Sequence, residues 1–282
     1  MRRGFFNTAA AAAAPTPTPT ARCAPRESDY QGPQNFLGLP SWAPGEPCEF
    51  ENMLVMLHGD LDNSFNFMRF GRAVNLPKTC VWSLGGTLNA CGRAVYDNDD
   101  KFVRRWMLSE EEGANAETRA RQTAEASSKV RRALRVLRDE HGWDLTRVHL
   151  FGFSDGGAVA LDVAASMTGT ERLGGCIAVA AAALEPQTYA PCADAPTPVL
   201  FIAGTRDEVV PIERVRETAA AFVRRHHGCG AEVHGFDKTH GMISSAPEVQ
   251  ALMTFWGKTY KYSASKASDY GDNVVELRTA AS

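Results

Sequence analysis

The run from Val148 to Leu161 restricts the fold of this chain more than any other segment. It begins as an apolar stretch and turns, through Gly152-Phe153-Ser154-Asp155-Gly156-Gly157, into a helix of small residues. This is the G-x-S-x-G nucleophile elbow, a strained strand-to-helix turn that lifts a serine hydroxyl above a parallel sheet. Glycines are needed because side chains there would collide with the turn or the neighbouring strand. The run therefore predicts Ser154 at the carboxyl end of a parallel strand, beside the free N–H groups of a helix N-terminus.

Apolar strands alternate with amphipathic helices on both sides of this turn. The predicted strands are 53–57, 79–84, 147–151, 176–181, 199–203 and 231–236, and the predicted helices are 65–74, 115–140, 156–167, 211–226 and 246–259. This alternation indicates an α/β fold, with a mostly parallel central sheet and helices on both faces. Functional groups of such a sheet lie in the loops at the carboxyl ends of its strands.

Composition excludes several classes of protein. The net charge of −3 over 282 residues indicates neither a nucleic-acid groove nor a disordered acidic activator. No apolar run approaches the roughly 20 residues of a membrane-spanning helix. The seven cysteines form no C-x-x-C pair, so they are expected to be mostly reduced and buried, as in the cytoplasm. Cys229 follows His226-His227-Gly228, but no second ligand pair exists, and a polar helix end is the favoured interpretation over a metal site.

The two ends of the chain differ from the middle. Residues 1–45 contain an alanine run and alternating Pro and Thr, which predict an extended or disordered leader. Its arginines and lack of acidic residues before Glu27 fit an organelle transit peptide, for the mitochondrion or plastid, as well as they fit an untargeted leader. We expect one folded domain over 46–260 and an exposed polar tail over 261–282.

A serine hydroxyl needs a base to act as a nucleophile, and the base needs an orienting carboxylate. In the arrangement built on the elbow, these residues follow in the order Ser, Asp or Glu, His, each in a loop after a strand. Asp207 follows the strand 199–203 and lies too early to cap a helix that begins at Pro211. His240 stands beside a glycine after the last strand. We predict Ser154, Asp207 and His240 as catalytic residues, with Glu208 as the fallback for the carboxylate.

The other histidines are poorer candidates for the general base. His234 lies within a strand, and His141 and His149 have no motif around them. His58 precedes Gly59 in the loop after the first core strand and is expected to brace that loop through its ring nitrogens.

An oxyanion hole needs backbone N–H groups from two loops. One is the amide of the residue after the nucleophile, Asp155. The other comes from the loop after the first core strand, where the amide of Asp60 is the candidate and that of Leu61 is a possible additional donor.

Taken together, these residues resemble the acyl-protein thioesterase/carboxylesterase family of α/β-hydrolases. The matching segments run over about residues 50–257, and they are listed here together: Leu54-Val55-Met56-Leu57-His58-Gly59, Gly152-Phe153-Ser154-Asp155-Gly156-Gly157, Gly204-Thr205-Arg206-Asp207-Glu208-Val209-Val210-Pro211 and Thr239-His240-Gly241-Met242. The resemblance implies an α/β-hydrolase without a large lid domain, a Ser-Asp-His triad at the positions above, and ester or thioester substrates with an acyl chain in a surface groove. It implies no cofactor.

The sequence departs from the family pattern at two positions beside the expected oxyanion hole. Family members usually carry glutamine after the nucleophile and an apolar residue after His-Gly, whereas this chain has Asp155 and Asp60. Two carboxylates there would oppose a developing oxyanion, unless they point away or pair with arginines. Residues 85–100 also depart, in the region that helps to wall the acyl groove in the family.

The leading hypothesis is therefore a serine hydrolase that cleaves small esters, lipids or acylated proteins through an acyl-enzyme. A lysophospholipase-like activity is an alternative within the same class. A binding or signalling protein with weak turnover is the alternative from another class, because a fold alone does not fix function.

Overall fold

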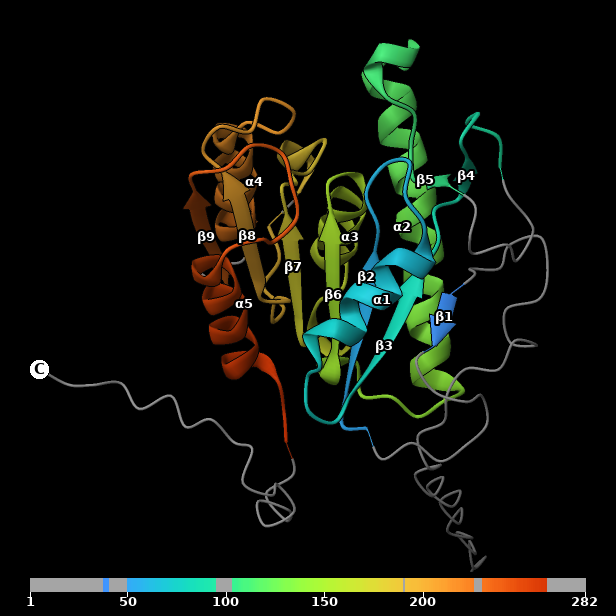
Figure 1. Cartoon of the computed structure of the whole chain (residues 1–282). Coiled ribbons are helices and arrows are strands. Elements are labelled where there is room, and N and C mark those ends of the chain that lie inside the picture. Colours follow the sequence, from blue (N-terminus) through green and yellow to red (C-terminus); the bar gives the residue numbers. More distant parts are fainter. Residues whose placement is uncertain (1–37, 41–49, 95–102, 190, 226–229, 263–282) are drawn as a thin grey trace, which may run out of the picture.

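A computed structural model describes residues 38–40, 50–94, 103–189, 191–225 and 230–262 of the chain (Figure 1). Apart from residues 38–40 and 261–262, the predicted leader and tail lie outside the described residues, as do Cys229 and His226-His227. Residues 38–40 lie within the predicted leader. They form the short strand β1 (Gly38–Pro40), which pairs antiparallel with the edge of the central sheet.

The described residues form a central sheet with the strand order β1-β3-β2-β6-β7-β8-β9. Every strand except β1 runs parallel to its neighbours, as predicted. The parallel strands are β2 (Asn52–Leu57), β3 (Thr79–Leu84), β6 (Val148–Phe153), β7 (Gly175–Val179), β8 (Val199–Gly204) and β9 (Ala231–Phe236). β7 ends two residues before the predicted end, because Ala180 has a φ of 47° and leaves the extended conformation.

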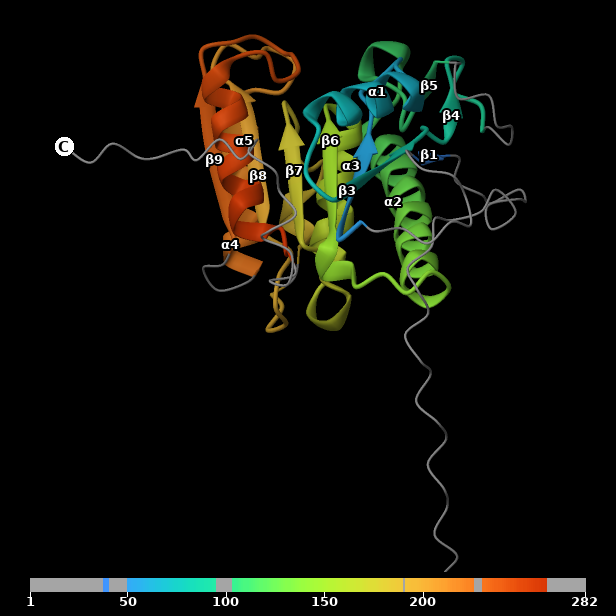
Figure 2. The same ribbon diagram turned by 60° about the horizontal axis from the view of Figure 1, so that its bottom comes forward.

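Helices cover both faces of the sheet (Figures 1 and 2). The helices are α1 (Ser64–Val74), α2 (Ala116–Asp139), α3 (Asp155–Ser166), α4 (Ile212–Arg225) and α5 (Ala246–Thr259). One apolar core joins α2, α3 and α4 to one face, and a second joins α1 and α5 to the other. Single 3₁₀ turns occupy Glu110–Glu112, Leu145–Arg147, Gly169–Glu171 and Pro186–Thr188. A small hairpin of β4 (Leu88–Asn89) and β5 (Arg104–Arg105) lies beside one end of α2.

The strand order reverses between β2 and β6. The chain first adds β3 on one side of β2, and then returns to place β6 on the other side and continues outward to β9. Loops at the carboxyl ends of two such strands leave in opposite directions, and a crevice opens between them. Asp60 follows β2 and Ser154 follows β6, so the fold places both at this crevice.

The described residues include no helix with the length and apolar character needed to cross a membrane. They also contain no group of three histidines, cysteines or carboxylates arranged to hold a metal ion. Cys80 and Cys176 are buried, as expected, whereas Cys91 is exposed in the turn after β4. No disulfide joins the cysteines of the described segments.

Two histidines are buried in neutral form, and this makes stability dependent on pH. Burial lowers the pKa of His58 to about 4 and that of His149 to about 3. In the unfolded chain both have a pKa near 6.5, so between these values the unfolded state binds more protons. The stabilisation from these two neutral histidines should therefore be fully present above about pH 7. The free energy of unfolding should fall as the pH drops below 6.5. The slope is about 1.4 kcal/mol per pH unit for each histidine.

Urea denaturation at pH 7, 6 and 5 measures this slope. His234→Asn is the matched control, because that side chain lies on the edge strand β9 and is 43% exposed. The control should keep the slope of the wild type. A free energy of unfolding that stays constant from pH 7 to pH 5 would contradict the prediction.

Candidate active site

Ser154 stands at the turn between β6 and α3 with a strained backbone. Its φ of 51° and ψ of −122° lie outside the usual regions for a residue with a side chain. The amide of Ser154 donates to Val179 O of β7 at 3.0 Å, which fixes the turn against the next strand. A Cβ at Gly152 would lie 2.5 Å from Gly156 O, so the close return of the helix onto the strand requires glycine there.

The structure brings together the three residues predicted from separate loops. His240 Nε2 lies 3.0 Å from Ser154 Oγ, and His240 Nδ1 lies 2.8 Å from Asp207 Oδ2. Asp207 follows β8 and His240 follows β9, so both reach Ser154 from the same edge of the sheet. The geometry allows a proton to move from the hydroxyl to the imidazole while the carboxylate holds the ring.

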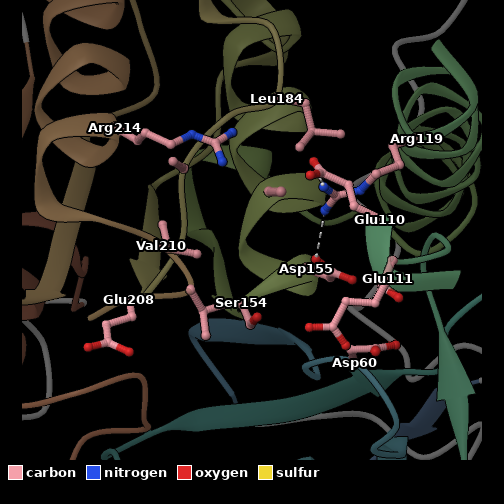
Figure 3. A pocket seen from close by; sticks show the side chains of 14 residues that line it. Asp60, Glu110, Glu111, Arg119, Ser154, Asp155, Leu184, Glu208, Val210 and Arg214 are labelled. Atoms are coloured by element: carbon pink, nitrogen blue, oxygen red, sulfur yellow. Dashed lines mark hydrogen bonds and ion pairs between the residues drawn. The ribbon is translucent and has the colours of Figure 1, made fainter. Parts of the chain in front are cut away.

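Asp207 uses its two carboxylate oxygens for different purposes. Oδ1 accepts hydrogen bonds from Val209 N at 2.9 Å and Val210 N at 2.8 Å, while Oδ2 faces His240. The side chain is completely buried. Glu208, the fallback from the sequence, is exposed, and its carboxylate points away from Ser154 (Figure 3).

The loop that carries His240 is held by a partly exposed lysine that pairs with a buried carboxylate. Lys238 Nζ donates to Gly241 O at 2.9 Å and to Met242 O at 3.2 Å, and it also pairs with Glu248 of α5. The imidazole of His240 packs against Phe153, with ring centroids 5.3 Å apart. These contacts fix the ring that faces Ser154.

His58 braces the loop after β2, as its sequence position predicts. Its Nδ1 donates to Gly59 O at 2.6 Å, and its Nε2 accepts from Gly86 N at 2.9 Å, which requires the neutral ring. Trp106 Nε1 donates to His58 O at 2.7 Å. The loop that carries Asp60 is therefore tied to the loop after β3 and to a buried indole. His141 and His149 are buried outside the cavity beside Ser154.

The two residues whose amides are predicted for the oxyanion hole lie on the same cavity as the nucleophile. Asp60, Ser154 and Asp155 all line this cavity. Within the described part of the chain, neither the Asp60 amide nor the Asp155 amide donates to another protein group. Two free N–H groups beside a serine hydroxyl suit a negatively charged oxygen.

An arginine neutralises the carboxylate of Asp60. Arg105 of β5 donates from Nε and from Nη2 to the two oxygens of Asp60, each at 2.6 Å, and its Nη1 contacts Glu112 at 2.5 Å. The Arg105 side chain is only 2% exposed. Because the pair is bidentate, the carboxylate is turned toward the β4–β5 hairpin and its charge is compensated there.

Asp155 is compensated more weakly. Arg119 of α2 pairs with Glu110 at 2.7 Å and reaches the Asp155 carboxylate only at 3.8 Å (Figure 3). Burial and then repulsion from Asp60 raise the pKa of Asp155 to about 6, although Arg119 acts in the opposite direction. At neutral pH a largely uncompensated negative charge therefore stands directly after the nucleophile.

Asp155→Asn should accelerate turnover in a pH-dependent way. Above pH 7 the wild-type carboxylate is ionised and opposes an oxyanion, so the variant should have a kcat about tenfold higher. As the pH falls toward 5, Asp155 of the wild type becomes protonated and residue 155 is neutral in both proteins, so the ratio of the two rates should approach one. Rate measurements on a neutral ester between pH 5 and 8 give this ratio. A ratio that does not vary with pH would show that the carboxylate has no influence on the rate.

The cavity beside Ser154 has a volume of about 390 Å³ and is lined mainly by polar and charged side chains (Figure 3). Its lining includes the carboxylates of Asp60, Glu110, Glu111, Asp155 and Glu208, the guanidinium groups of Arg119 and Arg214, and the apolar side chains of Leu184, Val209 and Val210. None of the described residues of the segment 85–100 lines it. That segment instead supplies β4, which pairs with β5 and so supports Arg105.

Sequence reasoning did not identify the arginines of the site. Arg105 and Arg119 belong to no motif, and the aspartates that they meet at the site, Asp60 and Asp155, lie far away in the sequence. Arg214 carried one signal, because a cation in the first turn of a helix is unfavourable to the helix dipole.

Comparisons with known proteins agree with this architecture. Residues 49–259 match the family model described as phospholipase/carboxylesterase. The uncharacterized hydrolase UM10204 of Mycosarcoma maydis is 26% identical over 74% of this chain and 77% of its own length. The crystal structure of esterase PE8 has a TM-score of 0.65 at 18% identity and covers 79% of this chain and 99% of that one. The Bacillus cereus carboxylesterase has a TM-score of 0.61 at 16% identity, over 80% and 95% of the two chains.

The structural likenesses show the fold, and the family match covers most of the described residues. In the described part of the chain, no separate lid domain covers the carboxyl ends of the strands (Figure 1). The protein is therefore an α/β-hydrolase and belongs to the phospholipase/carboxylesterase family.

Proposed function

We propose that this hydrolase cleaves carboxylic ester or thioester bonds through an acyl-enzyme on Ser154. The observation that carries the proposal is the pair of hydrogen bonds from Asp207 through His240 to Ser154 Oγ. This set supplies a nucleophile, a general base and an orienting carboxylate, which are the groups that acyl transfer needs. The reaction requires no cofactor.

In the first half of the reaction, Ser154 Oγ attacks the acyl carbon while His240 Nε2 accepts the hydroxyl proton. The carbonyl oxygen becomes an oxyanion that receives hydrogen bonds from the amides of Asp60 and Asp155. The tetrahedral intermediate then collapses, and His240 returns the proton to the departing alcohol or thiol. The acyl group remains as an ester of Ser154.

In the second half, His240 removes a proton from water, and the hydroxide attacks the acyl carbon. The bond to Ser154 Oγ breaks, His240 reprotonates this oxygen, and the carboxylic acid leaves. Asp207 stabilises the imidazolium in both halves without taking the proton.

The cavity favours small, polar substrates over long-chain lipids. Its charged lining would be desolvated by a long alkyl chain, which costs free energy unless those groups find new partners. Its volume of about 390 Å³ lies near the lower end of ligand sites. We therefore expect turnover of 4-nitrophenyl acetate and butyrate to exceed that of the palmitate ester by at least about tenfold. A maximum at long chains would favour the lysophospholipase-like alternative.

A covalent probe tests the proposed mechanism directly. A fluorophosphonate should label the wild-type protein at Ser154, and mass spectrometry of the digested protein should locate the adduct there. Ser154→Ala should not be labelled, whereas Ser128→Ala, which alters an exposed serine of α2, should label as the wild type does. Equal labelling of wild type and Ser154→Ala would exclude the mechanism. Ligand binding with turnover that Ser154→Ala leaves unchanged would favour a binding protein.

A further inference from the structure

Arg214 extends from α4 into the cavity without a partner. Figure 3 shows its guanidinium group in the space above Ser154, opposite Arg119. Arg119 is held by Glu110 at 2.7 Å. Among the described residues, the side chain of Arg214 makes no hydrogen bond or ion pair. Two arginines of the described segments line the cavity, and Arg214 is therefore the one whose guanidinium group is free to bind a ligand.

The position of Arg214 on α4 gives no stability to the helix. It is the third residue of the helix, where the partial positive charge of the N-terminus repels a cation. Glu217 lies one turn further along, at a spacing that allows an ion pair, yet the two side chains do not pair. By contrast, Arg216 pairs with Glu213 on the outer side of the same helix, at 3.6 Å.

The surroundings of Arg214 suit an anion with the shape of a carboxylate. A guanidinium presents planar pairs of donors that match the two oxygens of a carboxylate. The side chain of Arg214 is exposed at the cavity mouth, so a ligand can reach it from solvent, and the half-buried Leu184 and Val210 line the same cavity. Glu208, the acidic residue of the cavity lining that precedes α4, points away from Arg214 (Figure 3).

The opposite wall of the cavity would orient such a substrate. Glu111 and Asp155 lie there with Asp60, and their charges repel an anion from the oxyanion-hole side. Arg105 compensates Asp60 through a bidentate pair, whereas Arg119 reaches Asp155 only at 3.8 Å, so uncompensated negative charge stands on the wall opposite Arg214. A carboxylate on the substrate would therefore lie at Arg214 and leave the ester carbonyl at Ser154.

We propose that Arg214 determines specificity by binding a carboxylate on the acyl or the alcohol part of the ester, so that the preferred substrates are monoesters of dicarboxylic acids or acyl esters of hydroxy acids. This proposal rests on the proposed function. It adds that the enzyme recognises a carboxylate on the substrate, at Arg214, in addition to the ester group at Ser154.

Matched esters test it by pH-stat titration of the released acid. Monomethyl glutarate carries the carboxylate on the acyl part, 3-acetoxypropionate carries it on the alcohol part, and methyl butyrate and propyl acetate are their neutral counterparts. The wild type should prefer at least one anionic ester over its counterpart. Arg214→Gln should lower kcat/KM for that ester by about tenfold or more, mainly through KM, which is the effect expected for one charge-assisted hydrogen bond. The rates for the neutral esters should stay within about twofold.

Arg216→Gln is the matched control, because it removes the same charge from the outer side of the same helix. It should leave the preference intact, and added salt should weaken the preference in the wild type. Equal losses on anionic and neutral esters in Arg214→Gln would assign this residue a structural role and overturn the proposal. Preference for the cationic methyl 4-(trimethylammonio)butanoate would also overturn it.

A binding measurement separates this proposal from the proposed function. Monomethyl glutarate is titrated into Ser154→Ala protein with and without Arg214→Gln, and binding is followed by NMR. Weaker binding in the double variant supports the role of Arg214 even if no ester is hydrolysed. Equal binding overturns that role, whereas failure of fluorophosphonate labelling counts only against the acyl-enzyme mechanism.

Discussion

Ser154→Ala will reduce kcat on a small ester by a factor on the order of 10⁵. The variant lacks the atom that carries the acyl group in the proposed mechanism, so neither half of the proposed reaction can follow the route through Ser154. The remaining rate should come from water, assisted by the two free amides of the loops. The loss corresponds to about 7 kcal/mol of transition-state stabilisation.

Steady-state kinetics of purified wild type, Ser154→Ala and Ser128→Ala measure this effect. The double variant Ser154→Ala/His240→Ala should be nearly as active as Ser154→Ala alone, because the base acts through the hydroxyl that is already missing. A double variant that is much less active than Ser154→Ala would mean that His240 also acts on another group. A loss below about tenfold in Ser154→Ala would remove Ser154 from the mechanism.

Gly156→Ala will impair both stability and activity. A Cβ at this position would lie 2.2 Å from His58 O and 2.6 Å from Leu57 O, and both are backbone atoms that cannot rotate away. His58 O is also held in place by the indole of Trp106. Overpacking of this kind costs about 1–3 kcal/mol. If the loop after β2 moves to relieve it, the Asp60 amide leaves the position proposed for it in the oxyanion hole, and we expect kcat to fall a further ~10²-fold or more.

Thermal unfolding and kinetics on the same preparations separate the two effects. Gly257→Ala is the control, since a Cβ there meets no atom within 4 Å and lies in α5, where alanine favours the helix. It should keep the wild-type kcat and raise the melting temperature slightly. A Gly156→Ala protein with wild-type stability and kcat would show that the close contact between the elbow and the loop after β2 is not needed for either property.

Much of the fold follows from local patterns in the sequence. The apolar runs of β2, β3 and β8 and the buried face of α2 were predictable because each depends on residues close together in the chain. The ends of elements were less predictable. β7 stops early at Ala180, whose left-handed backbone no propensity indicates, and β1 forms because the edge of the sheet offers it a partner.

The sequence also predicted that Ser154, Asp207 and His240 lie close together, because each follows a strand of the same parallel sheet. Parallel strands place all the loops that follow them at one edge, so chain order and loop position are enough to bring the three residues together. The sequence also indicated that His58 supports its loop, because a histidine before a glycine at a strand end has few other uses.

The electrostatics of the cavity depended on the tertiary structure. Asp60 meets Arg105 across 45 positions of sequence, Asp155 meets Arg119 of another helix, and Arg214 meets no acidic partner in the described chain. Such pairings depend on how α2, α4 and the β4–β5 hairpin pack around the strand ends, to within an ångström. The sequence pattern therefore determined which residues could act as nucleophile, base and carboxylate. The packing of the elements decided which charges of the cavity are paired and which remain free, because Coulomb interactions depend on distances that no sequence spacing specifies.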